Sequence, residues 1–326
     1  MALNTENGSN HHFFSSKKGS KRHLPLPASR RSLYLFAMTQ IRLSAAFAMA
    51  ACIASGQVPE TQTVPPWVSS LGYQSSEIFP ISIGRFGYPY LQVMVNRRAI
   101  NLPLDTGNMF RLVFGQTEAQ RLKLPVTGQT SSYASNGELR GLRLTFKVAE
   151  MTALGRTWVD QSASEGDQPG LEGLFGPHYL LDRRFTLDYR RGLLAVSDSA
   201  MPTAMLEECL KLLPCRNEPG MPVVEGTVNG RKVLIQIDTG KRRTCIDTVL
   251  ARELDLPRTP DGWVIAEIRI GEWTCSVKSA RADDFSALGQ DLPAPILLDI
   301  GSDMLPQVLM TIDLRTNRLL LAAQHN

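Results

Sequence analysis

Apolar residues recur in short stretches along most of the chain, and clusters of Gly, Asn, Asp and Pro separate these stretches. The segment 93–107, VMVNRRAINLPLDTG, returns in similar form at 226–240 as GTVNGRKVLIQIDTG. In the second copy Asn229-Gly230 is a strong signal for a two-residue turn between two β-rich runs. Each copy therefore predicts a β-hairpin whose second strand runs directly into Asp-Thr-Gly.

The correspondence between the two copies continues downstream of Asp-Thr-Gly. A short helix that a proline ends is predicted at 120–125 and again at 251–257. Later, each copy has a glycine after an apolar stretch, 12 residues before an aspartate that begins the turn of a final hairpin. The glycines are Gly176 and Gly301, and the aspartates are Asp188 and Asp313. Landmarks in one order at matched spacing predict a tandem duplication of a mostly-β unit, and hence an all-β fold with a few short helices.

The duplication divides the chain into an N-terminal lobe at 78–198 and a C-terminal lobe at 221–323, with a cleft expected between them. The Pro-bounded segment 199–220 is expected to be a linker with one short amphipathic helix. The Pro- and Thr-rich segment 57–77 is expected to be a flexible spacer. Residues 1–56 have the features of an export leader, because basic residues precede a short apolar run.

The apolar run of the leader, at 43–54, is too short to span a bilayer and is rich in small residues. Met38 is an alternative start to Met1, because the residues after it already make a compact signal peptide. A disordered basic tail or a nuclear-type signal is the alternative to export. The sequence MAAC, which ends at Cys52, also resembles a bacterial lipoprotein processing site, so lipidation stays open beside cleavage. We therefore expect an exported bacterial protein, either periplasmic or anchored to a membrane of the cell envelope.

The positive net charge of the chain comes from the leader. The chain has 35 basic and 31 acidic residues. Seven of the basic residues and one of the acidic residues lie in 1–56, so 28 basic and 30 acidic residues remain in the rest of the chain. Because the basic excess disappears with the leader, nucleic acid is not expected as a partner.

Cysteines and histidines limit the chemistry that the chain can perform. The cysteines beyond the leader are Cys209, Cys215, Cys245 and Cys275. An even number in an exported protein allows two disulfides, most locally 209–215 and 245–275, and free buried thiols are the equal alternative. Only His178 and His325 lie beyond the leader and no CxxC occurs, so we expect neither a metal site nor a histidine-dependent nucleophile.

The two copies differ most in the segment that follows the short helix. From Asp105 to Gly176 the chain takes 71 residues, whereas from Asp238 to Gly301 it takes 63. The first copy has a polar hairpin at 127–146 with an Asn136-Gly137 turn, and the second has only 258–270 in its place. One lobe is therefore predicted to carry a long projecting hairpin that the other lacks.

The chain resembles the retropepsin-like aspartic proteases. The resemblance lies in two apolar strands that each end in Asp-Thr-Gly. Each strand is followed by a helix, an apolar element with a glycine and a closing hairpin. The exported bacterial members of that family are most similar, particularly through 173–196. The resemblance covers most of 78–323 and implies a pepsin-like arrangement, in which both lobes are fused in one chain. It implies a monomer that hydrolyses polypeptides and needs no metal or cofactor.

The resemblance also implies a role for each residue of the repeat. Asp105 and Asp238 would face each other as the catalytic pair, and Tyr133, Asn136 and Gly137 would belong to a flap over the cleft. Four residues would support the pair: Thr106 and Thr239 through hydrogen bonds between the loops, and Gly107 and Gly240 through tight turns. Gly176 and Gly301 would permit close backbone approach behind each loop.

Two carboxylates about 3 Å apart cannot both ionise easily, and the dyad of this family is itself the standard example of such a shared proton. The ionised member would take a proton from a bound water, which attacks the peptide carbonyl. The protonated member would hydrogen-bond the carbonyl oxygen and later help to protonate the leaving amine. The titration belongs to the pair, so neither residue is assigned as acid or base.

Lys241 departs from the family pattern, which has a small residue after Asp-Thr-Gly. An ammonium about 5 Å from the dyad would favour double ionisation by about 3 kcal/mol at an effective dielectric of 20, whereas one that points to solvent would have little effect. This departure motivates a second hypothesis, a catalytically silent relative that binds peptides. Cys52 motivates a third, a membrane-anchored protein that interacts with the envelope.

Overall fold

The computed structural model describes residues 64–108, 110–166 and 172–324. The predicted leader 1–56, with Cys52, and the first part of the predicted spacer lie outside the described residues. The described chain is mostly β with a few short helices, as the sequence predicts. Among these residues, no helix has the length and apolar character that a membrane span requires.

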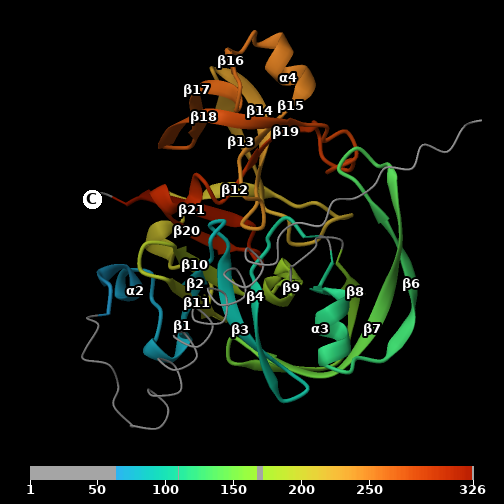
Figure 1. Cartoon of the computed structure of the whole chain (residues 1–326). Coiled ribbons are helices and arrows are strands. Elements are labelled where there is room, and N and C mark those ends of the chain that lie inside the picture. Colours follow the sequence, from blue (N-terminus) through green and yellow to red (C-terminus); the bar gives the residue numbers. More distant parts are fainter. Residues whose placement is uncertain (1–63, 109, 167–171, 325–326) are drawn as a thin grey trace, which may run out of the picture. The chain divides into compact units, whose positions relative to one another are not determined.

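The N-terminal copy forms an eight-stranded sheet in which the order is β2-β3-β7-β8-β5-β9, with β4 paired to β3 and β6 to β7. Its strands alternate buried and exposed residues, as in β3, because one face packs on the core and the other faces outward. Figure 1 shows the long strands β7 and β8 curving around the short helix α3. The strands are β2 Ser82–Ile83, β3 Pro89–Val95, β4 Arg98–Pro103, β5 Leu112–Phe114, β6 Val126–Tyr133, β7 Leu139–Ala153, β8 Arg156–Glu165 and β9 Gly173–Phe175.

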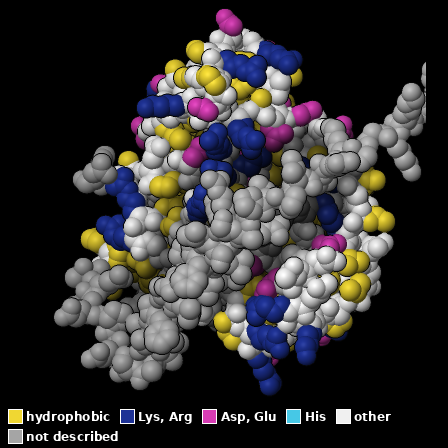
Figure 2. Space-filling view, in the orientation of Figure 1, with side chains coloured by type: hydrophobic (Ala, Val, Ile, Leu, Met, Phe, Trp, Pro, Cys, Tyr) yellow, Lys and Arg dark blue, Asp and Glu magenta, His cyan; other side chains and the backbone are white. Residues whose placement is uncertain are grey.

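The C-terminal copy and the closing hairpins form a thirteen-stranded sheet in the order β1-β11-β10-β20-β21-β12-β13-β14-β19-β15-β18-β17-β16. The closing hairpins are β10 Arg184–Asp188 with β11 Leu193–Ser197, and β20 Val308–Asp313 with β21 Arg318–Ala323. The other strands are β1 Ile78–Pro80, β12 Leu210–Leu213, β13 Val223–Val228, β14 Arg231–Ile237, β15 Cys245–Asp247, β16 Arg258–Thr259, β17 Gly262–Ile270, β18 Trp273–Asp283 and β19 Ile296–Ile300. In Figure 2 basic and acidic side chains lie interspersed over the C-terminal lobe.

The closing hairpins of the two copies pair with each other through β10 and β20. Thr186 and Thr311, which occupy equivalent positions in the two copies, are direct neighbours in this antiparallel pair. Their hydroxyls are 2.7 Å apart and hydrogen-bonded in the interior. The two copies therefore meet about a local two-fold relationship at this pair of strands.

The short helices α3 Gln116–Arg121 and α4 Thr248–Glu253 start three to four residues before the predicted helices and end before the prolines. The side chain of Asp247 accepts hydrogen bonds from the amides of Val249 and Leu250, which fixes the start of α4. Lys123 and Asp255, with φ of 55° and 45°, end the helical turns ahead of each proline. The predicted boundaries were therefore wrong, although the helices exist in both copies.

The second half of the predicted flexible spacer is ordered in the structure, so that prediction was wrong for residues 66–77. Helix α2 Pro66–Ser70 and the 3₁₀ turn η1 Ser75–Glu77 bring Val68, Leu71 and Tyr73 into a buried cluster with the closing hairpins. In addition, the indole nitrogen of Trp67 donates a 2.9 Å hydrogen bond to Asp188. Apolar burial and this bond offset the entropy of ordering the segment.

The predicted linker helix within 199–220 does not form. Instead, the 3₁₀ turn η3 Thr203–Met205 is followed by β12, which pairs with β21 on one side and β13 on the other. The strand satisfies backbone groups on two sheet edges that a helix would leave unpaired. The linker is therefore an integral strand of the large sheet. The remaining 3₁₀ turns are η2 Pro177–Leu180 and η4 Leu305–Gln307.

The N-terminal segment can be tested for its contribution to stability. Leu71→Ala should lower the free energy of unfolding by about 2–5 kcal/mol, because it removes a fully buried side chain from the cluster with the closing hairpins. Ser69→Ala, an exposed change in the adjoining helix α2, should stay within about 0.5 kcal/mol of wild type. Denaturant unfolding measures both, and equal midpoints for Leu71→Ala and wild type would restore the spacer interpretation.

Candidate active site between the two repeats

Each Asp-Thr-Gly segment lies at the end of the inner strand of its hairpin. Asp105 follows β4 and Asp238 follows β14. The amide of Asp105 donates to the carbonyl of Phe175 at 3.0 Å, and the amide of Asp238 donates to the carbonyl of Ile300 at 2.9 Å. Equivalent strands, β9 in the first copy and β19 in the second, therefore hold the two loops in place.

The two loops are joined by four hydrogen bonds, two between their threonines and two from the threonine hydroxyls to backbone carbonyls of the opposite loop. The amide of Thr106 donates to Oγ1 of Thr239 at 3.1 Å, and the amide of Thr239 donates to Oγ1 of Thr106 at 3.0 Å. Each hydroxyl in turn donates to the carbonyl that precedes the opposite aspartate, Ile237 at 2.7 Å and Leu104 at 2.6 Å. Both threonines are buried, so these bonds fix the distance and orientation of one loop relative to the other.

The glycine of each loop allows the opposite carboxylate to approach. A Cβ built on Gly107 would overlap the carboxylate of Asp238, and one built on Gly240 would overlap that of Asp105. Each glycine amide also donates to the aspartate of its own loop, at 3.0 Å for Gly107 and 2.8 Å for Gly240. The two carboxylates therefore lie against each other across the junction of the repeats.

Gly176 and Gly301 allow the chain to pass close behind each loop. A Cβ on Gly176 would overlap the carbonyl oxygen of Phe110, and a Cβ on Gly301 would lie 2.8 Å from that of Lys241. Any side chain at either position would push the loop out of place. All eight residues that the sequence proposes for the pair and its support are thus brought together.

Burial and mutual repulsion control the charge of the pair. Asp105 and Asp238 are each 9% exposed. Burial and the negative charge of Asp238 raise the pKa of Asp105 well above its ordinary value. Burial also raises the pKa of Asp238, against the opposing effects of the Lys241 ammonium and the Gly240 amide. The pair therefore retains a proton at a pH at which exposed aspartates are ionised.

Lys241 neither points to solvent nor stands alone beside the dyad. Its ammonium lies 3.3 Å from Oδ2 of Asp283 and 3.5 Å from Oδ2 of Asp299. Burial would lower the pKa of Lys241, but the carboxylates, Asp299 first among them, raise it. The positive charge is therefore shared with two acids, which reduces its effect on the dyad.

Asp299, Gln236 and Tyr88 are site residues that the sequence interpretation missed. Asp299 is 2% exposed; burial and the charge of Asp238 raise its pKa, and the Lys241 ammonium 3.5 Å away opposes this rise and favours the ionised carboxylate. Gln236 is equally buried, and half-buried Tyr88 has a pKa raised by burial and by both dyad carboxylates. The available signal was a polar residue inside an apolar strand, Gln236 in VLIQID and Asp299 in LLDIG.

The dyad lies at a cleft of about 280 Å³ that the β6–β7 hairpin borders. The hairpin turn is closed by a 2.9 Å bond from the amide of Gly137 to the carbonyl of Ala134, and Gly137 has a φ of +81° that favours glycine. Asn136 accepts from the amide of Glu138 within the turn.

The hairpin also contacts the cleft and the C-terminal lobe. Tyr133 and Ser135 line the cleft, and the amide of Ala287 donates a 3.1 Å hydrogen bond to the carbonyl of Ser135 at the hairpin tip. The trimmed counterpart in the second copy is the short β16–β17 pair.

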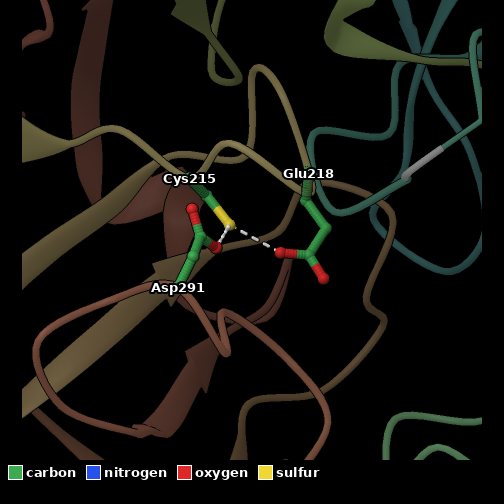
Figure 3. A group of neighbouring side chains, drawn as sticks. All are labelled: Cys215, Glu218 and Asp291. Carbon is green, nitrogen blue, oxygen red and sulfur yellow. Dashed lines mark hydrogen bonds between the residues drawn. The ribbon is translucent and has the colours of Figure 1, made fainter.

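The four described cysteines are free thiols, so the disulfide alternative is not realised. Cys215 lies 2.5 Å from a carboxylate oxygen of Glu218 and 3.1 Å from one of Asp291 (Figure 3). The three groups are close enough to hold a cation, although no metal site was expected. Burial and the two carboxylates raise the pKa of the thiol, which favours a protonated sulfur that donates to them rather than a thiolate ligand.

His178, the described histidine, lies in η2, outside the residues that line the cleft. Burial and the nearby charge of Arg111 lower its pKa. It therefore lies away from the carboxylate pair, and the sequence predicted no histidine-dependent nucleophile.

No family model matches the chain, and no curated protein is found to be similar. Among solved structures, the crystal structure of Basic 7S globulin from soybean is 12% identical with a TM-score of 0.44. The match covers 76% of this chain and 94% of that one.

The shared proton predicts a dependence of stability on pH. In the unfolded chain both aspartates ionise near pH 4, whereas the folded pair keeps a proton above that pH. Unfolding therefore releases a proton, and wild-type stability should fall as pH rises toward the raised pKa, by at most about 1.4 kcal/mol per pH unit. Asp105→Asn should then be more stable than wild type at pH 7, with a smaller gain at pH 4.

Thermal unfolding at both pH values measures this difference. Asp261→Asn removes an exposed carboxylate in a turn and serves as the control, with a similar effect at both values. A stability gain for Asp105→Asn that does not change with pH would contradict a pair that shares a proton.

Proposed function

We propose that the protein is an aspartic endopeptidase that hydrolyses peptide bonds with a water activated by Asp105 and Asp238. The observation that carries this proposal is the pair of buried carboxylates, held against each other by the reciprocal bonds of Thr106 and Thr239. A fold has little reason to bury two like charges together, because each raises the energy of the other. Such an arrangement is characteristic of sites that need a shared proton.

In the proposed reaction the pair starts with one proton, gains a second from the water during the attack and returns one to the leaving amine. The ionised carboxylate takes a proton from the water as its oxygen bonds to the peptide carbon. The protonated carboxylate donates a hydrogen bond to the carbonyl oxygen, where negative charge develops. When the C–N bond breaks, the pair returns a proton to the amine, so the starting protonation state is restored. The amides of Gly107 and Gly240 keep the carboxylates oriented.

An extended polypeptide is the substrate class that the cleft favours. The β6–β7 hairpin lies across it, and both lobes contribute to the lining. A peptide lying between the hairpin and the dyad could add main-chain hydrogen bonds to the hairpin and place its side chains alternately to either side. Because one chain supplies both carboxylates and the flap, a monomer suffices for the proposed reaction.

The catalytically silent alternative derives from Lys241. Its ion pairs with Asp283 and Asp299 weaken this argument, because an ammonium between two acids adds little net positive charge to the dyad. The same cleavage experiment separates the two functions. A folded wild type that binds peptides but cuts none would favour the silent relative.

Cleavage of a diverse peptide pool tests the proposed function. Wild type, Asp105→Asn, Asp238→Asn and the exposed control Asp261→Asn are incubated with the pool from pH 3 to pH 8. New termini are then counted by mass spectrometry. We expect cleavage by wild type and Asp261→Asn, and a loss of at least about 10³-fold in both dyad variants, because each loses the shared proton or its acceptor. Equal cleavage by Asp105→Asn and wild type would contradict the proposal.

Lys241→Met tests how the lysine tunes the dyad. The ammonium lowers the pKa of Asp238, so its removal should raise the pKa values of the pair. Both limbs of the pH profile of kcat/KM should then move to higher pH, the acidic limb because the second proton binds more readily and the alkaline limb because the shared proton is kept longer. An unchanged profile would show that Asp283 and Asp299 already cancel the charge of Lys241.

A further inference from the structure

Two buried acceptor atoms in the cleft have no hydrogen-bond partner among the described residues. They are Oε1 of Gln236 and Oδ1 of Asp299, and both residues are 2% exposed. Both residues line the cleft beside the dyad. Buried acceptors are normally paired, so a pair left open at a cleft indicates that a ligand supplies the donor.

The sheet aims these two side chains at the cleft. Gln236 and Asp299 are direct neighbours in the parallel pair β14–β19. Alternate residues of a strand point to the same side, so Gln236 faces the same way as Asp238, two residues further on. The acceptors therefore form one polar patch next to the dyad.

The first copy shows that the fold does not require this polar patch. Two residues before Asp105 stands Pro103, and two residues before Gly176 stands Leu174. These are the equivalents of Gln236 and Asp299, and both are apolar. The C-terminal copy has acquired a polar pair where the duplicated unit otherwise packs apolar side chains.

The charge around the patch is predominantly negative. The ammonium of Lys241 contacts Oδ2 of Asp299 and Oδ2 of Asp283, which leaves Oδ1 of Asp299 available. One lysine stands against two carboxylates here, and the dyad adds the charge of its ionised member. Arg140, Arg143 and Glu165, on β7 and β8 of the N-terminal copy, line the same cleft.

We propose that Gln236 and Asp299 form a specificity subsite for a basic substrate side chain, Lys or Arg, which ends in donors only. The inference rests on the proposed peptidase function, because it assigns a side-chain preference to that cleft. Lys and Arg match two adjacent acceptors in a negative setting, whereas an acidic side chain would bring further acceptors and charge. An apolar side chain of the same length would leave both acceptors unpaired.

Matched peptides test this preference. A peptide cleaved by wild type is varied at each position near the scissile bond to Lys, Arg, norleucine or Glu, and kcat/KM is measured at one pH. At one position the kcat/KM of the Lys or Arg peptide should exceed that of the norleucine peptide by at least about tenfold, and the Glu peptide should have the lowest kcat/KM. The ratio of Lys to norleucine within one enzyme cancels any effect of a variant on the dyad.

Two variants should change this ratio in opposite directions. Asp299→Asn removes negative charge from the patch and should lower it at least about fivefold, whereas Gln236→Glu adds a carboxylate and should raise it. Asp261→Asn, an exposed change of the same type, should leave the ratio as in wild type.

The outcomes distinguish the subsite from the proposed function. Cleavage without a basic preference at any position, or an unchanged ratio in Asp299→Asn, overturns the subsite and leaves the peptidase proposal intact. If wild type cleaves nothing, the peptidase proposal fails, and calorimetric binding of extended peptides that differ only in Lys or norleucine at one position decides the subsite. Tighter binding of the Lys peptide than of the norleucine peptide, weakened in Asp299→Asn, would support it, and equal binding would overturn it.

Discussion

The site depends on the reciprocal hydrogen bonds between Thr106 and Thr239. Two buried carboxylates repel each other, so the loops that carry them must be held together by something stronger than their own contact. Each threonine hydroxyl accepts from the opposite loop and donates to it, and therefore uses its donor and one acceptor position in the junction. The carboxylates can lie together because the backbone that carries them is already locked.

The same two-fold relationship recurs in the paired closing hairpins, where Thr186 and Thr311 meet. At both levels a residue lies beside its own counterpart in the other copy. Away from this axis the copies have diverged: only the N-terminal copy has the long hairpin at 127–146, and only the C-terminal copy has the polar pair Gln236 and Asp299. Symmetry is kept where the halves must fit each other, and is lost where a cleft between them needs two different walls.

Local patterns predicted the parts of the fold that depend on neighbouring residues. The two Asp-Thr-Gly loops, the hairpins before them and the turn at Asn136-Gly137 follow from strand periodicity and turn chemistry. The order of residues 66–77 could not be predicted from the same patterns, because Leu71 becomes buried only when distant hairpins pack on it. For the same reason β12 was missed, since its two sheet partners come from other parts of the chain.

Lys241 illustrates why the electrostatics of the site could not be predicted from the sequence. Considered alone, an ammonium beside the dyad would favour loss of the shared proton, and a lone Asp299 would be a third buried acid that resists ionisation of the pair. Together their opposite effects on the dyad largely offset each other, and the strand that brings Asp299 also positions its open oxygen at the cleft. Lys241 is therefore balanced by two acids, Asp283 and Asp299. Its partner Asp299 becomes tolerable near the dyad because Lys241 is there, which leaves a buried carboxylate available to interact with a ligand.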